Sequence, residues 1–192
     1  YQVLGWGGYW AWDPVETTSL LPWIGLTAYL HLSERSTKDG LLREFTVLAA
    51  FDGVIFLSAL TRGGLLNSVH AYAFSPAGPV LLFFAFAYIV YFLYLAKEKT
   101  ILLFNTENTI ASISMSAGLL ALAALFLVCL FGVAFPIVFN LITGKEVETT
   151  IGTYNMLTYP FTLLFILSLT GCSLEKLSKK MIYVAISFPL AL

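Results

Sequence analysis

The sequence predicts an all-α polytopic membrane protein: a bundle of five full transmembrane helices plus a truncated sixth. Three observations support this fold class. The 192 residues are 59% hydrophobic and only 11% charged, whereas a soluble domain is about half apolar and about a quarter charged. Long apolar runs are separated by short charged breaks. Ten Lys and Arg residues nearly balance eleven Asp and Glu residues, which excludes the basic surface of a nucleic-acid-binding protein.

The apolar runs define the expected spans, since about 20 residues are needed to cross a bilayer core. The five full spans are residues 15–32, 45–60, 77–96, 110–139 and 151–172. The fourth is longer than a bilayer requires, and Pro136 is its expected exit point. The final run, residues 181–192, is too short to cross. We therefore expect a piece of a longer protein or one product of a split gene.

The basic residues predict the orientation, because short loops rich in Lys and Arg remain inside. Arg62 and Lys145 fall on one side of the predicted bundle, and eight basic residues fall on the other. These eight are Arg35, Lys38, Arg43, Lys97, Lys99, Lys176, Lys179 and Lys180. Residues 1–14, 61–76 and 143–150 are therefore expected outside. Two spans separate the first of these segments from the second, so both lie on the same membrane face.

The chain is thus expected to have four parts. Residues 1–16 form a Trp-rich segment on the outer face, and residues 17–60 form two transmembrane helices. Residues 61–76 form an outer loop that contains His70, and residues 77–192 form helices three to six, the last incomplete.

The Trp-rich segment contains three of the four tryptophans within seven residues: Trp6, Trp10 and Trp12. One interpretation is an aromatic belt at the lipid headgroups. The other is a platform for a large planar ligand, with glycines that allow close approach. Asp13, Pro14 and Glu16 match a helix-capping pattern. The two acids therefore either cap the first span or also orient the tryptophans.

Four other polar residues are functional candidates. His70 is either a polar surface residue or a metal ligand, and Arg62 either snorkels or pairs with a ligand carboxylate. His31 lies at the inner end of the first span, where the helix dipole favours it. Asp52 is the one clear acid inside a span and has no basic partner in the predicted membrane region. Its role stays open: it is protonated, faces a cavity or pairs with an absent segment.

The stretch from Trp6 to Glu16, followed by Leu21-Pro22-Trp23, resembles the WWD signature of the haem-handling cytochrome c assembly family. The likeness is to its CcmF/NrfE-type haem lyase branch. Residues 61–73 resemble that branch's outer histidine loop, residues 97–108 resemble its inner loop, and residues 136–160 resemble its next outer loop. Ala11 and Thr17 depart from the family pattern without removing a proposed ligand.

The resemblance implies a haem site on the outer face. It would be formed by Trp6, Gly7, Gly8, Trp10, Trp12 and Asp13. His70 would be an axial ligand of the haem iron. We add Arg62, whose guanidinium could pair with a haem carboxylate. The family's second outer histidine and its two membrane histidines have no counterpart in this sequence, and no residue is assigned to catalysis.

The resemblance implies a haem lyase, alone or within a multi-protein complex. It would attach haem b to apocytochrome c as two thiols of a C-x-x-C-H segment add across the haem vinyl groups. The expected location is the prokaryotic cytoplasmic membrane or the equivalent mitochondrial inner membrane. Expected partners are apocytochrome c, a haem chaperone of CcmE type, thiol-reducing and apocytochrome-binding assembly proteins, the rest of the haem lyase chain or a second split subunit, and membrane lipid.

Two alternative functions remain open. A cytochrome b-like electron-transfer subunit needs paired histidines within the membrane, whereas His31 and His70 are expected at opposite faces. A transporter would use Asp52 as a coupling acid and the Trp-rich segment as a belt. It would be favoured by broken half-helices at matching positions, which the sequence does not suggest.

Overall fold

The structure, a computed structural model, describes residues 10–35, 40–65, 72–97 and 110–174. It is all-helical over these residues, as predicted. The helices are α1 (Pro14–Arg35), α2 (Gly40–Arg62), α3 (Ala77–Ala96), α4 (Ile110–Thr143) and α5 (Ile151–Leu174). All five expected helices are present, and the bounds of α3 are those predicted.

Four of these helices are long and apolar enough to cross a membrane, judged by length and composition. They are α2, α3, α4 and α5. The first helix forms as expected, but it is not among the four, and its first two turns carry Glu16 and three consecutive hydroxyl residues. The count of five full spans is therefore not confirmed. The expected sixth lies outside the described residues.

The helix does not end at Pro136, the expected exit point of the fourth span, because α4 continues to Thr143. A proline inside a helix has no N–H to donate to the carbonyl four residues earlier, which here is that of Gly132. The hydroxyl of Thr149 donates to this carbonyl instead, with an oxygen–oxygen distance of 2.8 Å. The helix can continue because a residue of the following segment replaces the missing donor.

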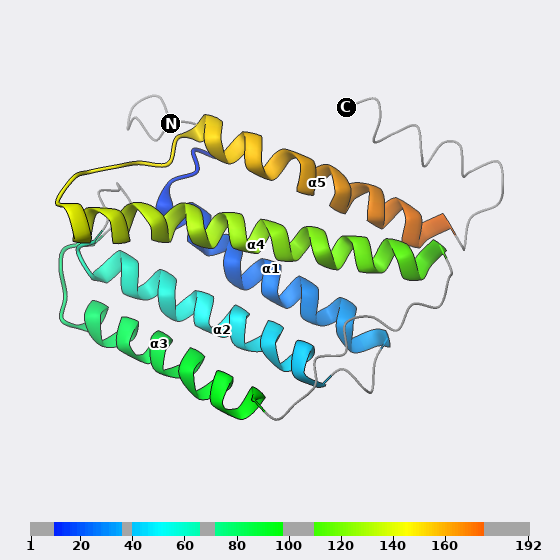
Figure 1. The fold of residues 1–192 in the computed structure, drawn as a ribbon, viewed down its shortest axis with the longest axis horizontal. Coiled ribbons are helices and arrows are strands. Elements are labelled where there is room, and N and C mark those ends of the chain that lie inside the picture. Colours follow the sequence, from blue (N-terminus) through cyan, green and yellow to red (C-terminus); the bar gives the residue numbers. More distant parts are fainter. Residues whose placement is uncertain (1–9, 36–39, 66–71, 98–109, 175–192) are drawn as a thin grey trace.

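The helices pack in the spatial order α3, α2, α1, α4, α5 (Figure 1). The central helix, α1, contacts both α2 and α4, while α3 and α5 lie at the two edges. The core is centred on Leu21, Ile24 and Ala28 of α1, with Leu122 and Cys129 of α4. Most side chains of the edge helix α3 are instead exposed, as expected for a surface that meets lipid or neighbouring helices.

Small residues bring neighbouring helices close together. A Cβ on Gly25 of α1 would lie 2.9 Å from the backbone nitrogen of Ala50 in α2. One on Gly118 of α4 would lie 2.6 Å from Oγ of Ser168 in α5. Close backbone approach at small residues is typical of helix packing in membranes, where lipid is as apolar as the helices themselves.

The start of α3 offers a test of this packing. Replacing Gly78 by alanine should destabilise the protein by about 1–3 kcal/mol, the usual cost of overpacking. The new Cβ would lie 2.6 Å from the backbone nitrogen of Gly63, which cannot rotate away. Thermal unfolding in detergent, followed by circular dichroism, measures the effect. Gly152→Ala is the control, because its Cβ meets nothing closer than 3.9 Å. Equal melting temperatures for the two variants would contradict the packing.

Candidate functional site

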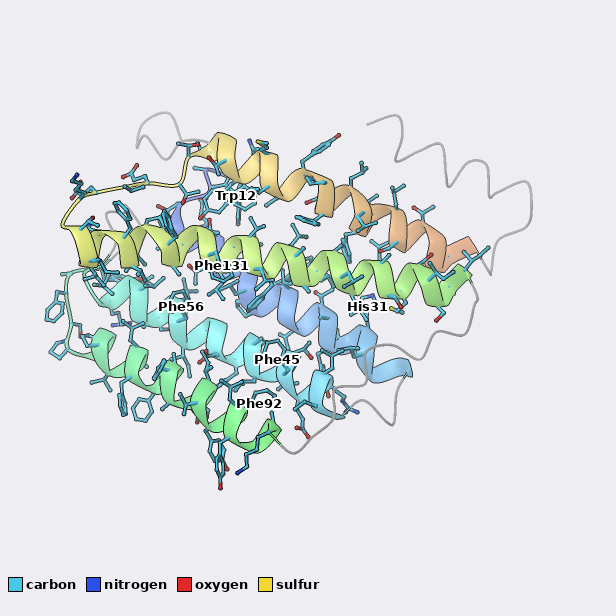
Figure 2. All side chains as sticks on the ribbon, viewed as in Figure 1. Trp12, His31, Phe45, Phe56, Phe92 and Phe131 are labelled. Atoms are coloured by element: carbon cyan, nitrogen blue, oxygen red, sulfur yellow. The ribbon has the colours of Figure 1, made fainter. Side chains whose placement is uncertain are left out.

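Three segments that are distant in the sequence meet at one end of the bundle (Figure 1). They are residues 10–13 with the start of α1, the end of α2 with both described flanks of the next loop, and residues 144–150 between α4 and α5. The described parts of the Trp-rich segment and of the histidine loop thus lie at the same end of the bundle. His31 lies toward the opposite end from Trp12 (Figure 2).

The described residues include four of the predicted site residues: Trp10, Trp12, Asp13 and Arg62. Trp6, Gly7, Gly8 and His70 lie outside them. Their proposed roles stay predictions, and the site is built here from the other four and their neighbours.

Asp13 begins α1 in the predicted manner. Its Oδ1 accepts a hydrogen bond from the backbone N–H of Val15 at 2.8 Å, so Asp13 is the N-cap. Glu16, at the N3 position where a capping box has its acid, bonds to a residue before the N-cap. Its Oε2 accepts from the backbone N–H of Ala11 at 3.0 Å. Glu16 therefore ties the residue between the two described tryptophans to the first turn of α1.

Trp12 has a left-handed backbone conformation, with φ of 55°. This conformation costs a non-glycine residue about 1–3 kcal/mol, so surrounding contacts must hold it. The indole Nε1–H donates to Oδ1 of Asn155 at 2.7 Å. The ring also stacks on Tyr154, with ring centroids 4.9 Å apart and planes at 6°. One face of Trp12 is therefore covered by α5.

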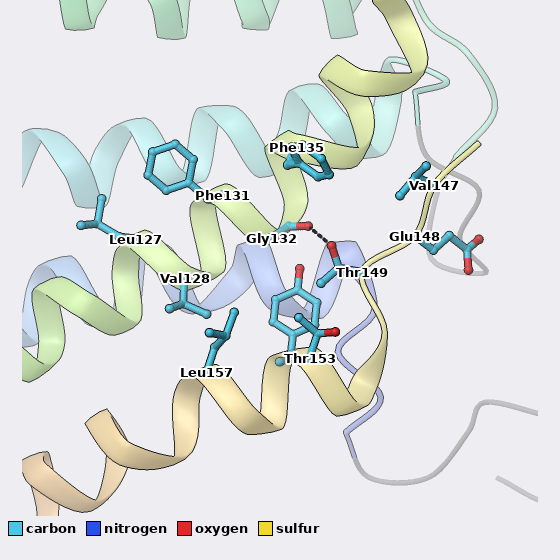
Figure 3. A pocket seen from close by; sticks show the side chains of 11 residues that line it. Leu127, Val128, Phe131, Gly132, Phe135, Val147, Glu148, Thr149, Thr153 and Leu157 are labelled. Carbon is cyan, nitrogen blue, oxygen red and sulfur yellow. Dashed lines mark hydrogen bonds between the residues drawn. The ribbon is translucent and has the colours of Figure 1, made fainter. Parts of the chain in front are cut away.

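Tyr154 is itself fixed in place and only 3% exposed. A Cβ on Gly132 would lie 2.5 Å from the Tyr154 hydroxyl, so only glycine leaves room for this ring. The Thr149 hydroxyl bond to the Gly132 carbonyl holds the preceding segment against α4 (Figure 3). Oγ1 of Thr150 accepts from the N–H of Thr153 at 3.2 Å and so caps α5.

Trp10 is more exposed than Trp12. Its ring meets Trp12 edge-on, with centroids 5.6 Å apart and planes at 88°. The residue is 41% exposed. Trp10 therefore presents an aromatic surface at the end of the bundle, while Trp12 anchors it.

The base of the histidine loop is fastened to the end of α2. Backbone N–H groups of Tyr72 and Ser75 donate to the carbonyls of Thr61 and Arg62, each at 2.8 Å. These bonds satisfy carbonyls that a helix end leaves without intrahelical partners. The Arg62 guanidinium carbon lies 5.5 Å from the centre of the Tyr72 ring, a cation–π contact. Arg62 thus holds the flank of the loop at the same end as Trp10.

An apolar groove of about 660 Å³ lies beside Tyr154, between α4, α5 and the segment that joins them (Figure 3). It is lined by Leu127, Val128, Phe131, Gly132, Phe135, Val147, Glu148, Thr149, Thr153, Tyr154 and Leu157. No group of three or more His, Cys, Asp or Glu that could hold a metal ion occurs among the described residues. The described part of this end is therefore mainly apolar and aromatic.

Neither His31 nor Asp52 is in the three segments that form this end. Nδ1 of His31 is 2.7 Å from the carbonyl oxygen of Thr27, one turn back in α1. Asp52 lies within α2, and its buried Oδ1 has no hydrogen-bond partner among the described residues. The role of Asp52 is not resolved by its surroundings.

Comparison with known proteins places these features in a family. Residues 1–61 match the family model described as cytochrome C assembly protein. The probable cytochrome c-type biogenesis protein NrfE of Escherichia coli strain K12 is 33% identical, over 86% of this chain and 31% of the relative. The chain belongs to the cytochrome c assembly family. The cytochrome c-type biogenesis protein CcmF of Pseudomonas fluorescens is also 33% identical, over 83% of this chain and 25% of the relative.

Sequence identity to one relative is higher over a shorter part of the chain. CcmF of Haemophilus influenzae is 44% identical over 79 residues, which are 40% of this chain and 12% of the relative. The chain spans about a third or less of the length of these curated relatives. No solved structure matches it. The family-matched residues include the Trp-rich segment, α1 and almost all of α2.

Sequence reasoning did not include Tyr154 and Asn155 among the candidate site residues. They lie 142 and 143 residues beyond Trp12, so no local pattern joins them to it. The signal that could have found them is the likeness of residues 152–155 to an outer loop of the CcmF/NrfE branch.

Proposed function

We propose that the chain acts in cytochrome c maturation as a haem lyase subunit. It holds haem b at the outer membrane face and promotes thioether attachment to apocytochrome c. The proposal rests on the family membership, together with the open Trp10 ring at the end where the base of the histidine loop is fastened. Its partners would be the apocytochrome, a haem chaperone and other assembly proteins.

The described residues suit the work of holding and orienting this substrate. An exposed indole offers a flat apolar surface for a porphyrin, and Arg62 is a cation at the same end. The reaction adds thiols of the apocytochrome across vinyl groups, so the chain need supply no nucleophile. Its contribution is to fix the ring relative to the incoming thiols. The chain's proposed iron ligand is His70, on the loop whose base is fixed to α2.

The orientation of this end is part of the proposal. Arg62 ends α2 and Lys145 follows the end of α4, so these two basic residues assigned to the outer side lie at the same end of the bundle. Arg43 is in the first turn of α2 and Lys97 follows the end of α3, at the opposite end. The positive-inside rule then favours an outer location for the tryptophans, where apocytochromes would be met after export.

A tryptophan comparison tests the proposal. Trp10→Ala should lower both bound haem and holocytochrome c yield about tenfold. Removing about 60 Å² of apolar contact, at about 25 cal/mol per Å², costs about 1.5 kcal/mol. Haem staining of cytochromes and the absorbance of the purified protein measure the two effects.

Trp23→Ala is the matched control, because Trp23 is 55% exposed but lies two turns into α1. It should leave both quantities near wild type. Wild-type yield and haem content in Trp10→Ala would contradict the proposal. A haem-free wild-type protein would favour the transporter alternative instead.

A further inference from the structure

The first turn of α5 contacts the Trp-rich segment through two different interactions. We call Trp12, Tyr154 and Asn155 the Trp12 clamp. The Tyr154 ring, stacked at 4.9 Å and 6°, fixes the tilt of the indole plane. The bond from Trp12 Nε1–H to Asn155 Oδ1, at 2.7 Å, fixes its rotation within that plane. Together the two contacts leave the Trp12 indole one orientation.

The clamp is itself supported by α4 and by the cap of α5. Tyr154 occupies the space that Gly132 leaves free, and Thr149 bonds to the Gly132 carbonyl. Thr150 caps the turn from which Tyr154 and Asn155 project. The position of the clamp is therefore set by the packing of α4 against α5, independently of any ligand.

The clamp also determines how Trp10 is presented. The Trp10 ring rests edge-on against the Trp12 ring, and Glu16 holds the backbone of the intervening Ala11. A change in the orientation of Trp12 would therefore turn or release Trp10, which is 41% exposed. Tyr154 and Asn155 contact Trp12 and need not contact a ligand of Trp10.

We infer that Tyr154 and Asn155 are positioning residues for the haem-binding tryptophans, acting from α5 through Trp12. This inference rests on the proposed function and extends it. The Trp-rich segment would depend on a helix that begins more than 130 residues later in the chain. The family-model match ends at residue 61, well before that helix.

The test uses variants that change one contact in the full chain, expressed with its native assembly system. Asn155→Leu removes the acceptor at similar volume, and Trp12→Phe removes the donor but keeps a ring. Because the Trp12–Asn155 bond is exposed, water can satisfy a freed N–H, and the fold should survive. Both variants should shift the haem absorbance maximum and lower bound haem about fivefold, at unchanged protein level in the membrane.

Two further variants show that position, and not fold, is measured. Asn155→Asp retains an acceptor oxygen, so its haem absorbance and haem content should remain those of the wild type. Tyr154→Leu removes the stacked ring and should produce the same shift as Asn155→Leu. If Tyr154→Leu lowers the protein level, the test of the inference rests on Asn155→Leu and Trp12→Phe alone.

The outcomes separate this inference from the proposed function. If wild-type protein binds haem in a Trp10-dependent manner and Asn155→Leu and Trp12→Phe leave the spectrum unchanged, the positioning role is refuted and the proposed function stands. If Trp10→Ala also leaves haem and cytochrome c yield unchanged, both are refuted. A spectral shift that is present in Asn155→Leu and absent in Asn155→Asp supports the inference.

Discussion

Replacing His70 by alanine is expected to reduce holocytochrome c yield at least about tenfold. Outer-shell partners of metal ligands already contribute about 10–100-fold to metal affinity or activity, and a direct ligand should contribute no less. The fold should tolerate the change, because the base of the loop is held by the Tyr72 and Ser75 backbone bonds to α2. Haem staining of membrane and periplasmic fractions measures the loss.

The second histidine of the chain provides the matched control. His31 is remote from Trp12 and makes its described contact within α1. His31→Ala should therefore retain near-wild-type yield. Added imidazole should partly restore a His70→Gly variant, since a free ligand can enter the space left by the side chain. Normal yield from His70→Ala, or equal losses from both alanine variants, would contradict the ligand role.

Replacing Gly132 by alanine is expected to destabilise the protein by about 1–3 kcal/mol and also to impair cytochrome c assembly. The new Cβ would lie 2.5 Å from the Tyr154 hydroxyl and would overlap the ring. Tyr154 must then move away from Trp12, and the stacked contact is lost. Thermal unfolding and holocytochrome c yield are measured together.

A double variant separates the two effects of Gly132→Ala. Gly132→Ala with Tyr154→Leu removes the overlap, so its stability should exceed that of Gly132→Ala alone. It lacks the stacked ring, so cytochrome c yield should remain low. Recovery of yield along with stability would show that the damage came from packing and that the Trp12 clamp contributes nothing further.

Local signals in the sequence predicted the helices well. The apolar run of α3 ended where charge begins, and its bounds were predicted correctly. Asp13 was predicted as an N-cap because capping depends on residues within one turn. Pro136 shows the converse, because it does not end the helix that contains it. The hydrogen bond that Pro136 cannot make is replaced by one from the Thr149 hydroxyl, which lies in the segment after the helix.

The candidate site was only partly predictable for the same physical reason. The density of tryptophans predicted the segment on which the proposed site is built, and counting spans predicted that the histidine loop lies on the same face. The sequence could not predict that Trp12 is held in place while Trp10 is exposed. The residues that hold Trp12 are Tyr154 and Asn155, which come from a helix distant in the sequence. Likewise, hydrophobicity suggested a first span, but the polar start of α1 leaves it less apolar than the other helices.

The central claim is that this end of the bundle holds haem with His70 on its iron. Electron paramagnetic resonance of the oxidised, purified full-length protein tests it directly, because the ferric signal depends on the axial ligands. We expect a haem signal in the wild type that changes in His70→Ala and stays unchanged in His31→Ala. An identical signal in wild type and His70→Ala, or no haem in the wild type, would contradict the claim.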